Sequence, residues 1–158
     1  MIDAALVALG ESPLAEAMSA SRYIYPVVNA AHILALATLF GSILAFDLRL
    51  LGLFPKVAVQ PLAASLPRVA AVGLLLAAVT GFLLFAVEPL DYAGNPAFLT
   101  KLSLVAGGAA HAVFVHHSCE WKALIRNGGR IGPRLRLSAA TSLLLWTGAI
   151  VAGRFIAF

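Results

Sequence analysis

The stretch YIYPVVNAAHILALATLFGSILAF, residues 23–46, contains no Asp, Glu, Lys or Arg. A helix needs about 20 mostly apolar residues to cross a bilayer. This stretch meets that length, and His32 is its only residue that titrates near neutral pH. It predicts a membrane-spanning helix, and therefore an integral membrane protein.

The composition of the whole chain agrees with this interpretation. Of 158 residues, 61% are hydrophobic and 11% are charged, whereas soluble domains carry about a quarter charged residues. The single cysteine excludes an internal disulfide and gives no zinc-ribbon or iron–sulfur pattern. The net charge of +4 comes from basic residues beside apolar segments, which fits membrane topology better than nucleic-acid binding.

Three further stretches are long and apolar enough to span a bilayer, which predicts an all-α four-helix bundle embedded in the membrane. The predicted spans are residues 23–46, 69–87, 98–119 and 137–158. Short connections predict that consecutive helices are antiparallel neighbours. Residues 22–158 form the membrane domain, and residues 1–21 form either an interfacial segment that Pro13 interrupts or a disordered tail.

The charges in the connections predict the orientation. Residues 120–136 and residues 47–68 are both basic on balance, whereas the N-terminal segment and residues 88–96 are acidic on balance. Cytoplasmic loops carry the excess of Lys and Arg. We therefore expect both termini in the periplasm and the protein in a bacterial inner membrane.

Two histidines in the spans are candidate haem ligands. His32 follows Arg22 by ten residues and His111 follows Lys101 by ten, so each lies about 15 Å from a basic residue at the predicted outer boundary. Imidazoles at one depth on parallel helices predict one haem b held between them. Further candidate residues give clearance for the macrocycle or contacts for its propionates: Gly107, Gly108, Arg22, Lys101 and Arg154.

Each of these residues also has a structural interpretation. Membrane histidines hydrogen-bond neighbouring helices, here through Asn29, Thr80, Ser142 or Thr147. Glycines in spans permit close helix packing, and basic residues at span ends are anchors.

The stretch HAVFVHHSCEW, residues 111–121, offers a second metal site. On a continuous helix His116 and Cys119 share a face, whereas His117 is turned by about 100°. Copper(I) suits a His and Cys pair. An aromatic belt at Trp121, with histidines at headgroup level, explains the same residues without a metal.

Two other features of the first span have open interpretations. Tyr25, Asn29, His32 and Leu36 share a helix face, which lines either a cofactor pocket or a helix contact. At the other end of the span, Asp47 is expected to pair with a basic residue such as Arg68.

The stretch YPVVNAAHILALATLFGSILAFDLRLLG, residues 25–52, resembles the first span of an uncharacterised group of small bacterial inner-membrane proteins. Residues 68–117 are similar to the membrane domain of copper-resistance D-type proteins and to the membrane-embedded, haem-containing protoporphyrinogen oxidases. The matching positions are Thr80, Gly81, Lys101 and Leu102. The resemblance to the oxidases implies haem binding at His32 and a substrate or propionate contact at Lys101. This chain lacks their tryptophan-rich first span, so porphyrinogen oxidation is not carried over.

These patterns predict a b-type cytochrome-like membrane protein for electron transfer or membrane redox chemistry. As an enzyme it would be a membrane oxidoreductase or the electron-transfer subunit of one. The expected partners are the lipid bilayer, a quinone or redox protein, and a second copy of the chain. Two alternatives remain: a copper-handling or other metal-handling membrane protein, and a cofactor-free structural or assembly subunit. No nucleophile–base set, carboxylate pair or phosphate loop points to a hydrolase or a transferase.

Overall fold

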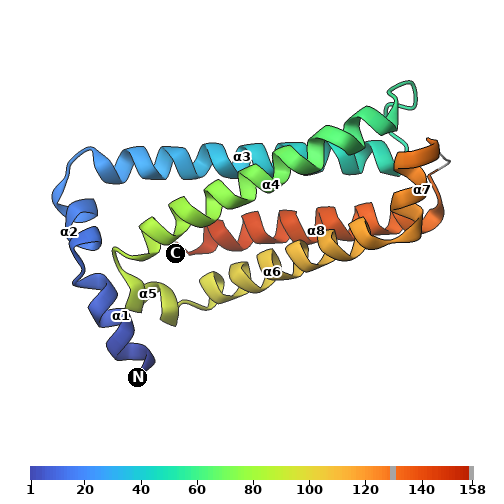
Figure 1. Cartoon of the computed structure of the whole chain (residues 1–158). Coiled ribbons are helices and arrows are strands. Elements are labelled where there is room, and N and C mark those ends of the chain that lie inside the picture. The colour runs from blue at the N-terminus through green and yellow to red at the C-terminus, as the bar shows by residue number, and fades with distance from the viewer. Residues whose placement is uncertain (129–130, 157–158) are drawn as a thin grey trace.

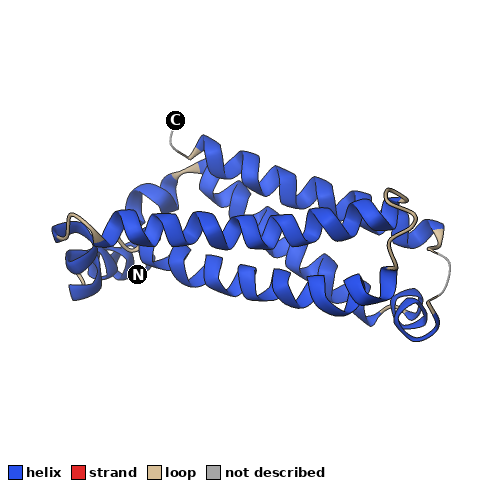
Figure 2. Cartoon of the chain, turned by 90° about the horizontal axis from the view of Figure 1, so that it is seen from above, coloured by secondary structure: helices blue, strands red, loops and turns tan. Residues whose placement is uncertain are grey.

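The computed structural model describes residues 1–128 and 131–156, and in these residues the regular structure is entirely helical (Figures 1 and 2). The helices in chain order are α1 (Ile2–Gly10), α2 (Pro13–Ala20), α3 (Ile24–Leu51), α4 (Val59–Phe85), α5 (Pro89–Gly94), α6 (Pro96–His117), α7 (Cys119–Asn127) and α8 (Pro133–Phe155).

Four of the helices, α3, α4, α6 and α8, are long and apolar enough to cross a membrane. Many of their large apolar side chains point outward; Leu75 of α4 is 65% exposed and Phe114 of α6 is 77% exposed. Such a surface suits lipid rather than water. The prediction of a multi-pass helical membrane protein is therefore confirmed at the level of fold.

The bounds of the helices differ from the predicted spans. α4 begins ten residues before predicted residue 69 and contains Pro67 in its interior. Proline removes one backbone donor and clashes with the preceding turn, so its position inside a helix is unusual. α6 ends at His117 because Ser118 leaves the helical conformation and accepts a hydrogen bond from Trp121 N, so that it caps α7 instead.

The four long helices form two hairpins. α3 packs along α4, α6 packs along α8, and a contact between α3 and α8 joins the pairs. The predicted neighbours α3–α4 and α6–α8 are confirmed. The prediction that α4 and α6 are also neighbours is wrong, because among the described residues they make almost no close backbone contact.

Glycines allow the close approach within each hairpin. A Cβ on Gly73 would lie 2.6 Å from the backbone N of Leu39, and a Cβ on Gly108 would lie 2.9 Å from Trp146 Cε2. The expected alternative role of glycine in helix packing therefore applies at both positions.

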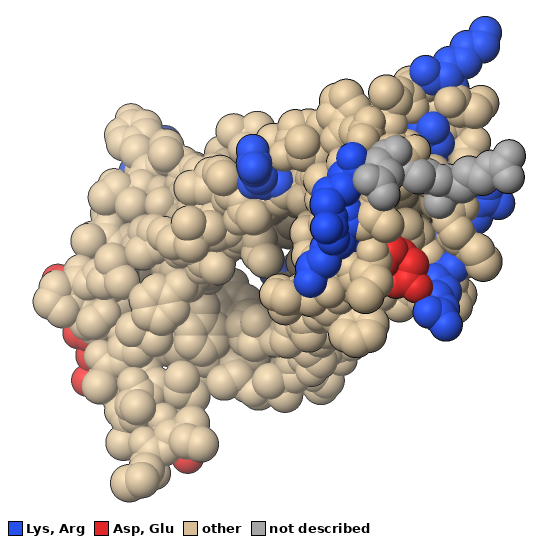
Figure 3. Space-filling view, turned by 45° about the vertical axis from the view of Figure 1, so that its right-hand side comes forward, with Lys and Arg blue, Asp and Glu red and all other residues tan. Residues whose placement is uncertain are grey.

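The tightest packing lies at one end of the bundle, where α7 crosses the long helices. Trp121 and Leu124 of α7 are buried against Phe46 and Leu50 of α3. The rings of Phe46 and Trp121 meet edge to face at 5.5 Å. Figure 3 shows Lys and Arg gathered over this end, which we call the basic end.

The opposite end, which we call the acidic end, carries α1, α2 and α5 (Figure 1). Residues 1–20 are helical rather than disordered, and the predicted interruption at Pro13 is confirmed. Ser12 caps α2 by accepting a hydrogen bond from Ala15 N. α2 packs on α3 and α1 packs on α5, so the N-terminal segment covers this end of the bundle.

Candidate functional site

The main candidate site is a pocket of about 550 Å³ at the acidic end, between the two hairpins. Side chains from five helices meet there, because α3, α4, α5, α6 and α8 all contribute to the lining. The lining residues are Tyr25, Asn29 and His32 of α3, Gly81, Leu84 and Phe85 of α4, then Glu88, Asp91, Tyr92 and Asn95, and finally Phe98, Lys101, Gly153 and Ile156. Of the predicted face, Tyr25, Asn29 and His32 therefore line a pocket, and Leu36 is not among the described lining residues.

The hydrogen bonds of His32 determine which ring nitrogen carries the proton. Nδ1 lies 2.8 Å from Thr80 Oγ1, and that hydroxyl lies 2.6 Å from the carbonyl oxygen of Leu76. A carbonyl only accepts, so the one hydroxyl proton goes to Leu76 and His32 Nδ1–H donates to Thr80. Thr80, one of the four possible partners that the sequence offers, is thus the partner of His32, and Nε2 keeps its lone pair.

Gly81 has no Cβ and therefore leaves room for the His32 ring. A Cβ at Gly81 would lie 3.1 Å from His32 Cε1 and 4.0 Å from Nε2. Even alanine would crowd the ring at the first of these distances, so glycine at this position allows the imidazole to lie against α4.

Among the described residues that line this pocket, Lys101 has the only cationic side chain. The sequence placed it at the membrane boundary, but α6 already begins at Pro96, so Lys101 lies in the second turn of the helix. The cause is Asn95, whose Oδ1 caps the helix by accepting from Ala97 N at 2.9 Å. Within the described residues, the Lys101 amine has no hydrogen bond or ion pair, and its charge acts on His32. The alkyl chain rests against Gly153.

Aromatic rings form one wall of the pocket. Phe85 and Phe98 stack at 5.4 Å with their planes 10° apart, and Tyr92 packs against Phe98 at 5.6 Å. Burial raises the pKa of the Tyr92 hydroxyl, and the neighbouring Tyr25, Glu88 and Asp91 raise this pKa further. In the sequence, residues 88–96 are only a connection between two spans, and no pattern there predicts that Tyr92 and Asn95 line a pocket. The presence of Tyr and Asn is the one hint of a polar lining.

His111 lies elsewhere and has another role. Its Nε2 lies 3.1 Å from the carbonyl oxygen of Ser138 and 3.0 Å from Ser138 Oγ. A carbonyl requires a donor, so Nε2 carries the proton and ties α6 to α8. His111 is not among the described residues that line the pocket containing His32 and Lys101.

The structure does not bring most of the remaining candidate haem-binding residues to the pocket. Gly108 packs against Trp146, and the nearest atom to a Cβ on Gly107 would be Leu145 Cδ2 at 3.9 Å. Arg22 and Arg154 are exposed and do not line the pocket. The structure therefore brings together His32 and Lys101 from the predicted set, with Gly81 and Gly153 beside them.

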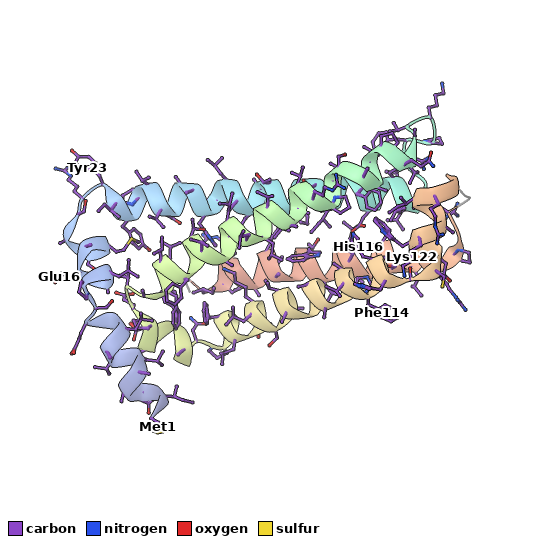
Figure 4. All side chains as sticks on the ribbon, in the orientation of Figure 1. Met1, Glu16, Tyr23, Phe114, His116 and Lys122 are labelled. Carbon is purple, nitrogen blue, oxygen red and sulfur yellow. The ribbon has the colours of Figure 1, made fainter. Side chains whose placement is uncertain are left out.

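The stretch around His116 has a different geometry from the one predicted. His116 Nδ1 donates to the Ala112 carbonyl at 2.6 Å, and the ring lies 4.3 Å from the Trp121 ring. Figure 4 shows His116 near the end of α6, beside α7. Because the helix breaks at Ser118, the prediction that His116 and Cys119 share one helix face is wrong. Nowhere in residues 1–128 and 131–156 do three or more His, Cys, Asp or Glu side chains form a group suited to a metal ion.

Comparison with known proteins gives a family and no close relative. Neither the curated proteins nor the solved structures contain a match to the chain. The model of one protein family matches residues 20–158, which include all four long helices and the acidic-end pocket. The chain therefore belongs to DUF6644, a family of unknown function.

Proposed function

We propose that the protein binds one haem b in the acidic-end pocket, where His32 would hold its iron, and takes part in electron transfer or redox chemistry in the membrane. The observation that carries this proposal is the state of His32: Nδ1–H is held by Thr80, and Nε2 keeps its lone pair on a side chain lining the pocket. Histidines that bind metals usually donate their second ring N–H in this way.

The other lining residues suit the same group. A pocket of about 550 Å³ falls within the range of 300–1,000 Å³ usual for ligand sites. The wall of Phe85, Tyr92 and Phe98 offers flat apolar contact. The unpaired Lys101 amine would bind a propionate carboxylate through a charge-assisted hydrogen bond. When bound, haem supplies one-electron chemistry, and the protein supplies the position and the electrostatic environment.

The proposal uses one histidine from the chain rather than the two that the sequence suggested. A ligand role for His111 would require Nε2 to release Ser138, and His111 is not among the described residues lining the pocket. We propose instead that His111 holds α6 against α8, and that His32 is the residue of this chain that would hold the haem iron.

We further propose that the protein lies in a bacterial inner membrane with its basic end in the cytoplasm. Lys and Arg gather at that end (Figure 3), as the positive-inside rule requires. The acidic-end pocket then opens toward the periplasmic side, where a quinone or a periplasmic redox protein would exchange electrons with the bound group.

The test is an optical spectrum of protein purified in mild detergent from cells with ample haem, both oxidised and dithionite-reduced. We expect a reduced α-band that His32→Ala abolishes. His111→Ala, the matched control, should keep the band and lower the unfolding temperature. Lys101→Gln should keep the band and release haem faster.

Two results would contradict parts of this proposal. Loss of the band in both histidine variants, with the fold intact, would restore the two-histidine arrangement. Absence of any haem band in the wild-type protein would overturn haem binding, and copper analysis of wild-type and Cys119→Ser protein would then separate metal handling from a cofactor-free assembly role.

A further inference from the structure

A second cavity, of about 490 Å³, lies at the basic end. It occupies the place where α3 ends at Leu51, α4 begins at Val59 and α8 begins at Pro133, and so lies at the boundary of the membrane-spanning segments. Its lining residues are Arg49, Pro55, Lys56, Val57, Ala58, Val59, Gln60, Gly128, Ile131 and Arg136.

The charged side chains among the described lining residues are all of one sign. Arg49, Lys56 and Arg136 line the cavity, and in the described part of the chain no Asp or Glu does. The single ion pair in the described part of the chain joins Arg134 to Glu120 and involves none of these three residues. Clustered cations without carboxylates repel one another unless an anion lies between them.

Arg49 is held in position by the connection between α3 and α4. Its Nε donates to the Val57 carbonyl at 2.7 Å, and one Nη donates to the Pro55 carbonyl at 3.3 Å. The other Nη makes no hydrogen bond within the described residues. A guanidinium fixed in this way is pre-organised, so it loses little conformational entropy when it binds an anion.

The start of α4 adds backbone donors to the same cavity. Its N-cap residue is Ala58, and no side chain caps the helix. Val59 and Gln60, the first two helical residues, both line the cavity. The first N–H groups of a helix lack partners within it, and the helix dipole makes this end of α4 positive. Anions with several oxygens, phosphates above all, bind such ends.

From the cavity, the three cations and the uncapped helix start, we propose that the basic-end cavity binds a phosphate group. Leu53, Phe54 and Val57 in the α3–α4 connection expose apolar side chains beside it, with Phe54 63% exposed. Apolar surface next to a cationic cavity at the membrane boundary matches a phospholipid, whose phosphate lies at that level and whose acyl chains lie alongside the helices. The phosphate therefore belongs to the headgroup of an anionic phospholipid in the leaflet at the basic end.

The experiment measures lipid binding to delipidated protein in a non-ionic detergent. Phosphatidylglycerol is titrated, and native mass spectrometry and the unfolding temperature report binding. The variant Lys56→Gln/Arg136→Gln removes two lining charges but leaves Arg49, which holds the loop. The control Lys122→Gln/Arg126→Gln removes two exposed charges from α7 at the same end. The net charges of the two variants are therefore equal.

A basic residue that contacts an anionic headgroup changes affinity about fivefold. We therefore expect the cavity variant to bind phosphatidylglycerol about 25-fold more weakly, and the control, whose two residues lie outside the cavity lining, to change less than about twofold. Equal losses of phosphatidylglycerol affinity in both variants would show that the lipid is held by diffuse electrostatic attraction. This result would overturn the proposed site. Equal binding of phosphatidylcholine and phosphatidylglycerol would overturn the anionic-lipid assignment.

A second part of the experiment distinguishes a lipid phosphate from free inorganic phosphate. Inorganic phosphate up to about 10 mM should leave lipid binding unchanged, since a headgroup anchored by acyl chains binds more tightly than the free ion. Displacement of lipid by phosphate in the wild-type protein, and not in the cavity variant, would support phosphate chemistry at the site and overturn the lipid as its source. Haem content is not measured in this experiment, so its outcome is independent of the function proposed above.

Discussion

His32 and His111 carry the same side chain in the same bundle, yet their hydrogen bonds leave different nitrogen atoms available. At His32 the acceptor is a hydroxyl that already donates to a carbonyl, so Nδ1 keeps the proton. At His111 the acceptor is the Ser138 carbonyl, so Nε2 keeps it. The identity of the acceptor on the neighbouring helix therefore distinguishes a candidate ligand from a helix contact.

Replacing Thr80 with valine tests this distinction at one residue. Valine has no acceptor, so His32 Nδ1–H loses its partner and the ring loses its fixed orientation. Loss of such an outer partner lowers metal affinity about 10- to 100-fold, and we expect haem retention to fall by this factor in a haem-transfer assay. Thr100→Val is the control, because Thr100 is exposed and bonds only to Pro96 O of its own helix. Equal retention in both variants would contradict the role of Thr80.

Asp47 provides a second test at the residue scale. Its side chain is buried, Oδ2 has no hydrogen-bond partner, and Ser142 lies within hydrogen-bonding reach. The expected pairing with Arg68 is wrong, since within the described residues Asp47 makes no ion pair.

We expect Asp47→Asn to raise the free energy of unfolding by about 1 kcal/mol, because an amide can bond to Ser142 without an uncompensated buried charge. Thermal unfolding in detergent measures the change. If the Asp47 carboxylate had an ionic partner, the substitution would instead lower the free energy of unfolding by about 3–5 kcal/mol.

At the scale of the elements, the pairing of helices depends on small residues in the contact faces. Gly73 lets α4 lie against the backbone of α3, and Gly108 lets α6 receive the Trp146 ring from α8. The backbones of α4 and α6 make almost no close contact, and at the acidic end the two helices meet through the stacked rings of Phe85 and Phe98. The hairpins therefore pack tightly within themselves, and the pocket lies between them.

Two glycine-to-alanine substitutions distinguish the effect of helix packing on stability from the effect of intrinsic helix propensity. Gly73→Ala places a Cβ 2.6 Å from Leu39 N, and such overpacking costs about 1–3 kcal/mol. Gly41 has no atom within 4 Å of a Cβ, so Gly41→Ala should be neutral or stabilising by up to about 1 kcal/mol. Unfolding temperatures of the two variants in one detergent give the comparison. A harmless Gly73→Ala would mean that α3 and α4 are not in contact there.

For the whole molecule, the distribution of charge between the two ends sets the expected orientation. The basic end contains α7 and the α3–α4 connection, and the acidic end contains α1, α2 and α5 (Figures 1 and 3). Glu120 at the basic end is partly exposed, with 39% of its side chain accessible. A hydrogen bond to its own backbone N–H, and then the Arg134 guanidinium, lower its pKa. It therefore stays ionised near neutral pH and offsets one positive charge of that end.

Cys119 allows the orientation to be measured with the native sequence. It is the only cysteine, and it is exposed at the basic end. We expect a membrane-impermeant maleimide to label it in inside-out vesicles and not in intact spheroplasts. Cys119→Ser combined with Asp3→Cys should show the reverse pattern, because Asp3 lies in α1. Labelling of Cys119 in spheroplasts would reverse the proposed orientation.

The sequence by itself determined the helical class, the four spans and the segregation of charge, because span length and hydropathy are local properties set by the bilayer. It also offered Thr80 among the possible partners of a histidine in the spans. Tertiary structure decided what no local pattern contains: that α6 pairs with α8 and not with α4, and that Tyr92 and Asn95 join His32 and Lys101 around one pocket whose described lining does not include His111. The start of α6 also depends on more than charge. A capping asparagine starts this helix before Lys101, because a helix begins where its backbone N–H groups find acceptors, whether or not a charge marks that point.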